Sequence, residues 1–450
     1  MSDPILTSSD PTAQRSVAVV GAGLVGCLAA CFLARRGYAV TVYERRPDPR
    51  LTAEERGRSI NLALSERGID ALRRLGLDEQ VMAPALPMHG RMVHGVDGTQ
   101  TFRSYSADGR QHINSISRSA LNATLLDAAE KAPDVRVVFG HRLTGLDVRT
   151  AQLTFETTDG PLEVSPDWVV GTDGAGSAVR QALMAAGVVT AEEDWQPYGY
   201  KELTIPARDG EFAMDPDALH IWPRGGSMMI ALPNPDRSFT CTLFWPLDGP
   251  GSFAEITTAE QVAEHFRRHY PDVPPLAPDH VSDYLHNPIG PLGTLHTSPW
   301  QHDGRFVLMG DAAHAILPFF GQGANSGFED CVALDQLLES TGDDLRLALP
   351  LFESARRENA EAIAGMAADN FTEMRDKVNS RLFQLTTRGE HLLEKWLPVY
   401  RTRYELVSFT TVPYAEVVRL VRRQRRLVAA GAAAGLAVLA AIGGGAWRSR

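Results

Sequence analysis

The sequence predicts an α/β fold with four parts: a Rossmann-like dinucleotide-binding domain, a mixed β-sheet domain, a C-terminal helical region and a terminal apolar helix. Three observations predict it. A glycine-rich turn at residues 21–26 separates a β-branched run from an apolar run with helical spacing. Residues 195–285 alternate in the manner of strands, and residues 331–425 have the amphipathic spacing of helices.

The composition narrows the class of protein. A chain of 450 residues is long enough for about two or three cores, and 44% hydrophobic residues are typical of a globular protein. A net charge of −11 speaks against a nucleic-acid partner, which requires a basic face. The cysteines form no CxxC pair and have no histidine cluster nearby, so we predict no metal site but buried free thiols in a reducing compartment: Cys27, Cys31, Cys241 and Cys331.

The two ends of the chain differ. Residues 1–15 are polar and lack the apolar core of a signal peptide, which predicts a short disordered leader. Residues 427–447 contain no charge, and as a helix they would span about 31 Å, enough to cross a bilayer. The preceding RRQRR predicts a cytoplasmic catalytic domain, tail-anchored to a membrane. A peripheral helix and an unordered tail are the alternatives.

The first element, residues 16–46, is predicted as strand, glycine turn, helix and strand. The GxGxxG turn allows the backbone to approach a pyrophosphate, and the following helix offers its N-terminal amides to the anion. Glu44 ends the second strand 18 residues after Gly26, where a carboxylate accepts hydrogen bonds from ribose hydroxyls. This unit predicts FAD or NAD, without choosing between them.

The following segments are predicted in chain order. Residues 57–77 pass from a loop into a helix, and residues 88–109 form a two-stranded hairpin. A capping serine, Ser117 or Ser119, precedes an amphipathic helix. Residues 135–160 are predicted as antiparallel strands.

Two further turns follow strands. Residues 167–183 are predicted as strand, turn and helix, with Asp173 at the strand end and the helix starting near Ser177. Taken alone, this is equally a nucleotide motif or a plain turn. In "RFVLMGDAAHAILPFFGQGANSGFEDC", Asp311 follows a strand and is placed to bond a polyol, and glycines then lead into a helix.

These three motifs together resemble the single-component FAD-dependent aromatic hydroxylases. Within that class, "GRSINLALSERG", "MHGRMVH", "GDAAHAILPFFGQGANSGFEDC" and "ADNFTEMRD" closely resemble the kynurenine 3-monooxygenase family, over residues 16 to 425. The resemblance implies a p-hydroxybenzoate hydroxylase-like fold. It also implies these divisions: an FAD-binding domain of residues 14–80, 113–186 and 287–345, a substrate-binding sheet domain of residues 81–112 and 187–286, a helical region of residues 346–426 and an anchor helix of residues 427–447.

The resemblance implies bound FAD. Glu44 would hold the adenosine ribose, Asp311 the ribityl chain and Arg118 the phosphate or ribityl side. Ala324 departs from the family, because we expect methionine there in the animal members. The full implied set of FAD-binding residues is Gly21, Gly23, Leu24, Gly26, Glu44, Arg45, Ala63, Arg118, Asp173, Asp311, Pro318, Gly321, Gly323, Ala324 and Asn325.

The implied substrate is L-kynurenine, an aromatic amine that carries an α-amino acid. Its carboxylate calls for a bidentate partner, which Arg91 can supply with Tyr105 on the neighbouring strand. The residues implied to bind the substrate are Arg91, Tyr105, Asn370, Tyr404 and Phe319. Tyr400 is the alternative to Tyr404. Phe319 and Phe320 either line the aniline ring or belong to the core, and His314 is expected to pack beneath the flavin loop.

The implied reaction is hydroxylation to 3-hydroxykynurenine with NADPH and O2, by way of a flavin C4a-hydroperoxide. The substrate's amino group activates its own ring, so no protein acid or base is predicted. Only one dinucleotide fold is visible, which suits NADPH as a transient co-substrate without a domain of its own. The chain is expected to be a monomer or a weak homodimer.

Three alternatives remain open. A flavin-dependent halogenase is expected to carry a tryptophan-rich strand where this chain has "YKELTIP". A prenyl-lipid reductase fits the apolar tail but does not explain Arg91 beside Tyr105. A membrane-tethered FAD-binding protein without turnover would show no substrate-stimulated NADPH oxidation.

Overall fold

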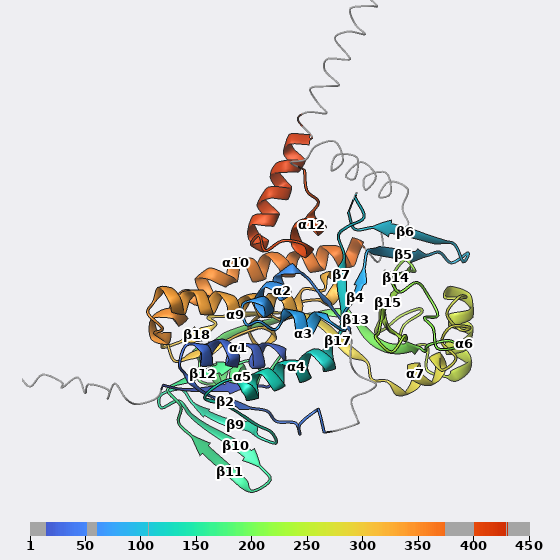
Figure 1. The fold of residues 1–450 in the computed structure, drawn as a ribbon. Coiled ribbons are helices and arrows are strands. Elements are labelled where there is room, and N and C mark those ends of the chain that lie inside the picture. Colours follow the sequence, from blue (N-terminus) through green and yellow to red (C-terminus); the bar gives the residue numbers. More distant parts are fainter. Residues whose placement is uncertain (1–14, 52–60, 107, 374–399, 429, 431–450) are drawn as a thin grey trace, which may run out of the picture.

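The computed structural model describes residues 15–51, 61–106, 108–373, 400–428 and 430. Within them, the strands form two large sheets and two three-stranded sheets, and helices cover the large sheets (Figure 1). The structure therefore has the predicted α/β organisation.

The first large sheet has six strands in the order β18-β19-β12-β1-β2-β8. All neighbours are parallel except β18 and β19, and Val19 lies between Val42 and Val170. Helices α1 and α4 pack on this sheet, as its buried apolar strands require. The bounds are β1 Ser16–Val20, α1 Leu24–Arg35, β2 Ala39–Tyr43, α4 Arg118–Lys131, β8 Val135–Val138, β12 Trp168–Gly171, β18 Gln301–His302 and β19 Phe306–Leu308.

The second large sheet has seven strands in the order β17-β13-β16-β15-β14-β5-β6. Only β14 and β5 are parallel, so the predicted mixed sheet is confirmed. Helices α6 and α7 pack beside this sheet, and buried aromatic side chains form the core between them. The bounds are β5 Gly90–His94, β6 Gln100–Ser104, β13 Thr190–Ile205, β14 Ala218–Pro223, β15 Met228–Pro233, β16 Phe239–Pro246, α6 Ala259–His269, α7 His280–His286 and β17 Gly290–Ser298.

Two predicted assignments differ from the structure. Strand β8 was expected in an antiparallel set with the strands after it, but it pairs in parallel with β2. Strand β17 lies in the range 287–345 assigned to the nucleotide-binding domain, yet it pairs with β13 in the seven-stranded sheet. Both differences arise because strand partners distant in sequence leave no local signal.

The two small sheets complete the strand pattern. Strands β3, β7 and β4 lie in the order β3-β7-β4, and β11-β10-β9 form an antiparallel sheet that projects from the body (Figure 1). The ring of Phe155 in β10 stacks on Tyr43 of β2 at 4.3 Å, so this sheet packs on the nucleotide-binding unit. The bounds are β3 Asn61–Leu64, β4 Leu86–Met88, β7 Ile113–Ser117, β9 Arg142–Asp147, β10 Gln152–Thr157 and β11 Gly160–Val164.

Helices α4 and α5 begin where the serines predicted them. Ser117 caps α4 by accepting a hydrogen bond from the amide of Ala120, and Ser177 caps α5 by accepting one from Arg180. The remaining helices near the sheets are α2 Glu66–Arg73, α3 Asp78–Met82, α5 Ala178–Ala185, α8 Asp311–His314 and the 3-10 turn η2 Pro318–Phe320.

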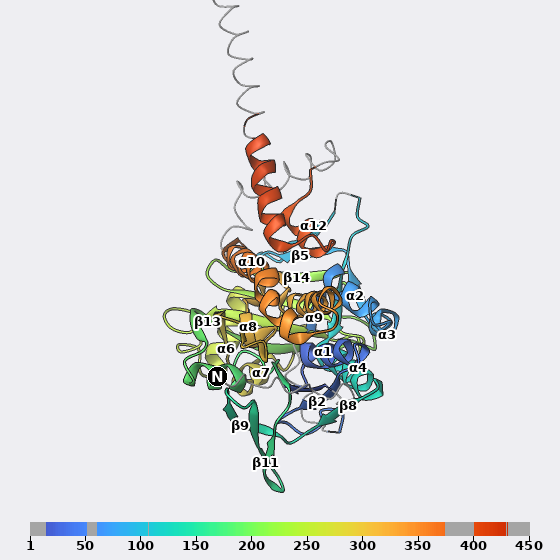
Figure 2. The same ribbon diagram turned by 90° about the vertical axis from the view of Figure 1, so that its left-hand side faces the viewer.

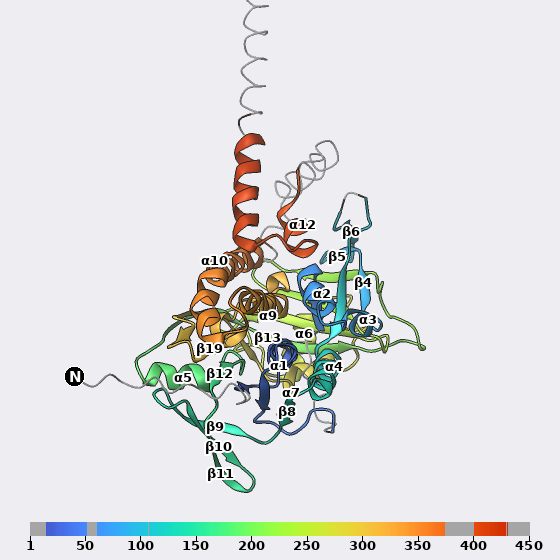
Figure 3. The same ribbon diagram turned by 60° about the vertical axis from the view of Figure 1, so that its left-hand side comes forward.

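The described residues from 323 onward are largely helical, as predicted for residues 331–425. Helix α9, Gly323–Ser340, packs against α1 and α2, and α10, Leu345–Thr372, packs against α9 (Figure 2). Helix α12, Arg403–Ser408, lies near β5, and a helix of residues 414–428 then projects from the body (Figure 3). These helices bring distant parts of the chain over the end of the seven-stranded sheet.

Several predictions concern residues that the structure does not describe. Residues 1–14 of the predicted leader, and residues 429 and 431–447 of the predicted anchor, lie outside the described residues. Among the helices that the structure describes, none combines the length and the apolar character that a bilayer crossing requires. The four cysteines are buried and unpaired, as expected.

Candidate functional site

The glycine turn is tightly packed on one side and open on the other. Gly21 has a φ of +103°, and a Cβ there would lie 2.8 Å from the Cα of Asp173. A Cβ on Gly26 would overlap the carbonyl oxygen of Gly21, whereas a Cβ on Gly23 would meet nothing within 4 Å. Gly23 is the N-cap of α1, and Leu24 is its first residue. The turn therefore leaves the N-terminus of α1 accessible to an anion.

Glu44 faces this turn from the end of β2. Its side chain is buried, and its carboxylate accepts hydrogen bonds from the amides of Ala22 (2.9 Å) and Arg46 (3.0 Å). The Arg46 side chain also pairs with Glu44 at 3.0 Å, whereas Arg45, the predicted ligand, is exposed. The arginine that pairs with Glu44 is thus Arg46, which sequence analysis did not name.

Helix α4 closes a further side of the turn. Asn122 donates from Nδ2 to the carbonyl of Ala22 at 3.1 Å, which brings the first turns of α4 beside the glycine motif. Arg118, at the start of α4, is exposed. Its side chain is therefore accessible to a ligand at the N-terminal end of α4. We predicted that Arg118 contacts the phosphate or ribityl side of FAD there.

Asp173 has a structural task in addition to its predicted one. Its carboxylate accepts hydrogen bonds from the Ser177 hydroxyl (2.5 Å) and from the amides of Ala178 (2.6 Å) and Val179 (3.2 Å). Burial raises the pKa of Asp173, although these donors oppose the rise. The side chain caps α5, and the Asp173 backbone packs against Gly21. Its carboxylate is thus already engaged within the protein.

The loop after β19 presents a carboxylate and open backbone. Asp311 is exposed and makes no hydrogen bond or ion pair with any residue in the described ranges. Gly321 is left-handed with a φ of +65°, and a Cβ on it would lie 3.1 Å from Cβ of Ala63. A Cβ on Gly323 would meet nothing within 4 Å, and Pro318 is exposed. This loop therefore has an accessible backbone face.

Asn325 joins the loop to β3. Its Nδ2 donates to the carbonyls of Ala63 (2.9 Å) and Gly321 (2.8 Å), and its Oδ1 accepts from the amide of Ser65 (3.0 Å). The side chain thus fixes the loop and does not reach into open space. Ala324 is partly buried against the main core.

A buried set of charges lies beneath the loop. Asp330 accepts hydrogen bonds from the amide of Gly310 (2.9 Å) and from Arg356 (2.8 Å), and it pairs with His314 at 2.6 Å. Burial opposes ionisation of Asp330, but His314 and Arg356 outweigh it and lower its pKa to about 2. The ring of His314 lies 4.7 Å from that of Trp300. His314 is therefore packed under the loop, as the sequence analysis expected.

The predicted substrate residues meet at the edge of the seven-stranded sheet. The Tyr105 and Tyr404 rings stack at 4.8 Å, and the guanidinium of Arg91 lies 4.8 Å from the Tyr404 ring and 5.7 Å from that of Tyr105. Nε of Arg91 and the Tyr105 hydroxyl are buried without a hydrogen-bond partner among the described residues. Arg91 has no carboxylate within ion-pair distance in this part of the chain. Among the described residues the cluster thus contains no carboxylate, although Glu373 lies close enough to favour the charge on Arg91.

The charge states of this cluster suit an anionic ligand. Burial opposes the charge on Arg91, but the Tyr404 and Tyr105 phenols favour it, so the pKa of Arg91 is raised. Burial raises the pKa of Tyr105 well above its usual value, which keeps the phenol protonated as a donor. A cation and a hydrogen-bond donor thus stand side by side.

Asn370 and Phe319 lie next to each other, farther along the same region. Asn370 donates from Nδ2 to the carbonyl of Phe319 at 2.6 Å, and the Phe319 ring stacks on Phe371 at 4.1 Å. Phe319 belongs to a hydrophobic core, and the Phe320 ring lies 5.8 Å from that of Tyr404. Of the two phenylalanines, Phe320 is thus the one in contact with the tyrosine cluster. Tyr400 lies half-buried before α12.

The residues present fit a flavin nucleotide. The open N-terminus of α1 at Gly23 suits a pyrophosphate, the accessible carboxylate of Asp311 suits a polyol, and the loop backbone at Gly321 and Gly323 is accessible to a flat ring. These features lie on the elements that Asn325 and Asp330 hold together.

Sequence reasoning missed the side chains that support this site. Arg67, Gln322, Glu329, Asp330 and Arg356 form buried contacts between α2, α9 and α10. The sequence offers one signal that such a side chain is buried, namely a charged residue beside apolar helical positions, such as Asp330 next to Cys331. Such a pattern does not name the partner.

The fold and site define the class, and comparisons with known proteins agree. A family profile described as "FAD binding domain" matches residues 14–363. A solved 2-methyl-3-hydroxypyridine-5-carboxylic acid oxygenase has a TM-score of 0.66 at 20% identity, covering 82% of this chain and 94% of that one. The structure of p-nitrophenol 4-monooxygenase PnpA from Pseudomonas putida has a TM-score of 0.67 at 20% identity, covering 84% and 93%. The class is that of FAD-binding monooxygenase folds.

Closer relatives specify the family. A protein of Myxococcus xanthus named kynurenine 3-monooxygenase is 47% identical over 403 residues, covering 89% of this chain and 87% of that one. Another of that name, from Dictyostelium discoideum, is 41% identical over 416 residues, covering 89% and 90%. The chain belongs to the kynurenine 3-monooxygenase family.

Proposed function

We propose that this protein is an FAD-dependent monooxygenase that converts L-kynurenine to 3-hydroxykynurenine with NADPH and O2. The observation that carries the proposal is the partly buried Arg91, whose Nε is buried without a hydrogen-bond partner among the described residues and whose guanidinium stands beside two tyrosines. Family membership supplies the reaction, and this cluster supplies a place for an amino acid's carboxylate.

Arg91 binds the substrate carboxylate in this proposal. A guanidinium presents two parallel donors to a carboxylate, and burial strengthens such a pair because little water competes. The Tyr105 hydroxyl, buried and unpartnered, supplies a further donor. Tyr404, stacked on Tyr105, covers the same group from α12. The three residues therefore orient the amino-acid end of kynurenine.

The aromatic end of the substrate then points away from Arg91 and toward the loop of residues 318–325. Phe320 belongs to this loop, its ring lies 5.8 Å from that of Tyr404, and it offers an apolar surface that excludes water. When bound, FAD would supply the redox chemistry of an NADPH-dependent hydroxylation, in which one oxygen atom of O2 enters the ring and the other leaves as water. The amino group of the substrate activates the ring, so no side chain needs to act as acid or base.

We assign the FAD contacts to two surfaces. The first is the glycine turn with Leu24, Glu44 and Asp173 behind it, and the exposed arginines Arg45 and Arg118 at its rim. The second is Asp311 with the loop of residues 318–325, against Ala63. In this proposal the nucleotide domain comprises residues 14–80, 113–186 and 287–345, apart from β17.

The test follows NADPH oxidation with and without L-kynurenine and analyses the products. Arg91→Met is expected to raise the KM for kynurenine by about 100-fold or more, because loss of a charged partner costs roughly 3 kcal/mol. Arg110→Gln is the matched control, since its side chain is 87% exposed in the loop after β6. Stimulated oxidation that yields only hydrogen peroxide would assign kynurenine as an effector, and no stimulation of the flavin-loaded protein would refute the proposal.

We further propose that the protein associates with membranes through residues 427–447. That stretch carries no charge, and the exposed arginines at residues 422–426 precede it on a projecting helix. The full chain is expected to sediment with membranes, and a chain ending at residue 426 to remain in the supernatant. Equal partition of both would refute this proposal.

A further inference from the structure

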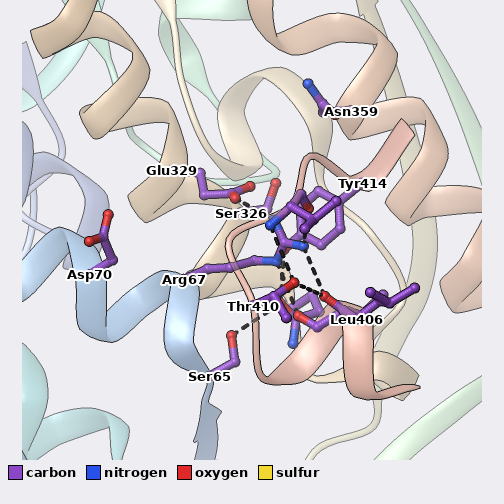
Figure 4. A network of polar contacts seen from close by, with 12 residues as sticks. Ser65, Arg67, Asp70, Ser326, Glu329, Asn359, Leu406, Thr410 and Tyr414 are labelled. Carbon is purple, nitrogen blue, oxygen red and sulfur yellow. Dashed lines mark hydrogen bonds and ion pairs between the residues drawn. The ribbon is translucent and has the colours of Figure 1, made fainter. Parts of the chain in front are cut away.

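Arg67 joins separate parts of the chain, and the proposed reaction does not use it. Its side chain is fully buried in α2. Nε donates to the carbonyl of Val407 at 3.1 Å, and Nη2 donates to the carbonyls of Leu406, at 3.4 Å, and Val412 (Figure 4). One guanidinium therefore binds three carbonyls that lie about 340 residues further along the chain.

These carbonyls belong to the end of α12 and the loop behind it. The last carbonyls of a helix have no partner within the helix, and a helix as short as Arg403–Ser408 does not hold itself. Thr410 donates to the carbonyl of Leu406, but Arg67 is the charged group that binds this helix end in the described structure. Arg67 thus holds the C-terminal end of α12, whereas Arg403 at its N-terminal end pairs with Asp369 (3.3 Å) and Glu373 (3.2 Å).

Helix α12 carries a residue of the proposed substrate site. The Tyr404 ring stacks on Tyr105 and lies 4.8 Å from the guanidinium of Arg91. A small displacement of α12 would open the aromatic cover over Arg91. The contacts of Arg67 in the described structure are with Glu329, Tyr414 and the carbonyls of residues 406, 407 and 412, and not with Arg91, Tyr105 or Tyr404.

The other contacts of Arg67 are with residues that support the flavin loop, which comprises residues 318–325. Its Nη1 pairs with Glu329 of α9 at 2.5 Å, and its guanidinium lies 3.9 Å from the centre of the Tyr414 ring (Figure 4). The Tyr414 hydroxyl donates to Oε1 of Gln322 at 2.8 Å, and Gln322 lies in the loop between η2 and α9. Arg67 therefore contacts both α12 and the supports of this loop.

We propose that Arg67 is a positioning residue that holds α12, and with it Tyr404, over the substrate pocket in register with the flavin loop. This inference rests on the proposed function for the identity of the substrate. The placement of α12 can be measured without any substrate, so the two ideas can fail separately.

The experiment compares wild type with Arg67→Met, which keeps an unbranched apolar side chain but removes every donor and the guanidinium over Tyr414. Arg73→Met is the matched control, because Arg73 lies on the same helix with its side chain 49% exposed and pairs with Glu66 at the surface. Amide hydrogen exchange is measured on the flavin-loaded proteins without kynurenine. Exchange in residues 403–414 is expected to accelerate at least about tenfold in Arg67→Met, equivalent to ~1.4 kcal/mol, and to be unchanged in Arg73→Met.

Steady-state kinetics then test the consequence for the substrate. In Arg67→Met the KM for L-kynurenine is expected to rise about tenfold. More hydrogen peroxide per NADPH is also expected, while NADPH oxidation without kynurenine stays at the wild-type rate. A merely structural defect would instead lower flavin content and slow both reactions together. If Arg67→Met does not fold, Arg67→Gln retains some donors and is expected to shift the same quantities in the same direction.

Exchange in residues 403–414 at the wild-type rate, in whichever variant folds, would overturn the inference. So would accelerated exchange with a KM and a peroxide yield equal to those of wild type. If wild type itself fails to hydroxylate kynurenine, the proposed function fails, and the exchange data alone still decide whether Arg67 holds α12.

Discussion

Replacing Asp330 by asparagine removes the central charge of the buried set beneath the flavin loop. The wild-type carboxylate is fully buried and contacts Arg356, His314 and the amide of Gly310 at 2.6–2.9 Å. Asparagine has nearly the same shape and keeps one acceptor oxygen. The variant therefore tests charge, with little change in packing.

The expected magnitude follows from the pKa of Asp330. Its neighbours lower this pKa from 3.8 to about 2, a stabilisation of the charged form by about 2 kcal/mol. Removing one partner of a buried ion pair typically costs ~3–5 kcal/mol, but Arg356 keeps Glu329 at 3.2 Å, which reduces the loss. We expect Asp330→Asn to lower the free energy of unfolding by about 2–3 kcal/mol. The melting temperature should fall by roughly 2–3 °C, because a 450-residue chain has a large unfolding entropy.

The direction of the pKa shift of Asp330 determines how its stabilising effect depends on pH. Because the folded pKa lies below the unfolded one, the stabilisation is complete above about pH 4 and is lost as the pH falls toward 2. The gap between wild type and Asp330→Asn should stay constant from about pH 8 to 5 and narrow only below about pH 4.

Thermal unfolding of both flavin-loaded proteins across this range is the measurement. Glu339→Gln is the control, because Glu339 lies on the same helix, is 75% exposed and should shift melting by only about 1 °C or less. Equal melting of Asp330→Asn and wild type, or a gap that changes near neutral pH, would refute the reasoning.

Three further predictions concern other parts of the chain. Gly21→Ala should abolish flavin binding, measured as visible absorbance per chain, because its Cβ would lie 2.8 Å from backbone atoms of Asp173 at a φ of +103°. Burial lowers the pKa of His220 to about 4. Wild type should therefore lose about 3 kcal/mol of unfolding free energy as the pH falls from 6.5 to 4, because the unfolded state binds the proton more readily. Acid denaturation curves should show a smaller loss for His220→Gln. Burial raises the pKa of every thiol, so a disulfide reagent should label none of them until the protein unfolds: Cys27, Cys31, Cys241 and Cys331.

The parts of the fold that sequence predicted are those whose signal is local. The glycine turn, the strands around it and the capping serines Ser117 and Ser177 follow from neighbouring residues. Strand β8 was assigned to the wrong partners, and the pairing of β17 with β13 was not foreseen, because pairing is a long-range property. An alternating run shows that a strand forms, but not which sheet it joins.

The site shows the same division in another form. Arg91, Tyr105 and Tyr404 were named from family motifs, and the structure brings them together. Asp173 and Asn325 were named as cofactor residues, and their side chains turn out to fix an adjacent helix and loop. Motifs thus locate a site, whereas the direction of each side chain depends on partners elsewhere in the sequence.

The buried charges account for how a glycine-rich loop keeps one shape. Residues 321–327 include three glycines, whose bare backbone suits a flat cofactor but supplies few side chains to fix the loop. Buried ion pairs are costly to form, and apolar residues of the same volume often stabilise a fold as well or better. Arg356 and Asp330 bind specific backbone atoms of Gly310 and Ser326, which apolar groups cannot do. We infer that these charges are retained for the geometry they impose. Since the loop cannot fix its own conformation, the residues that determine how it meets a flavin lie outside it.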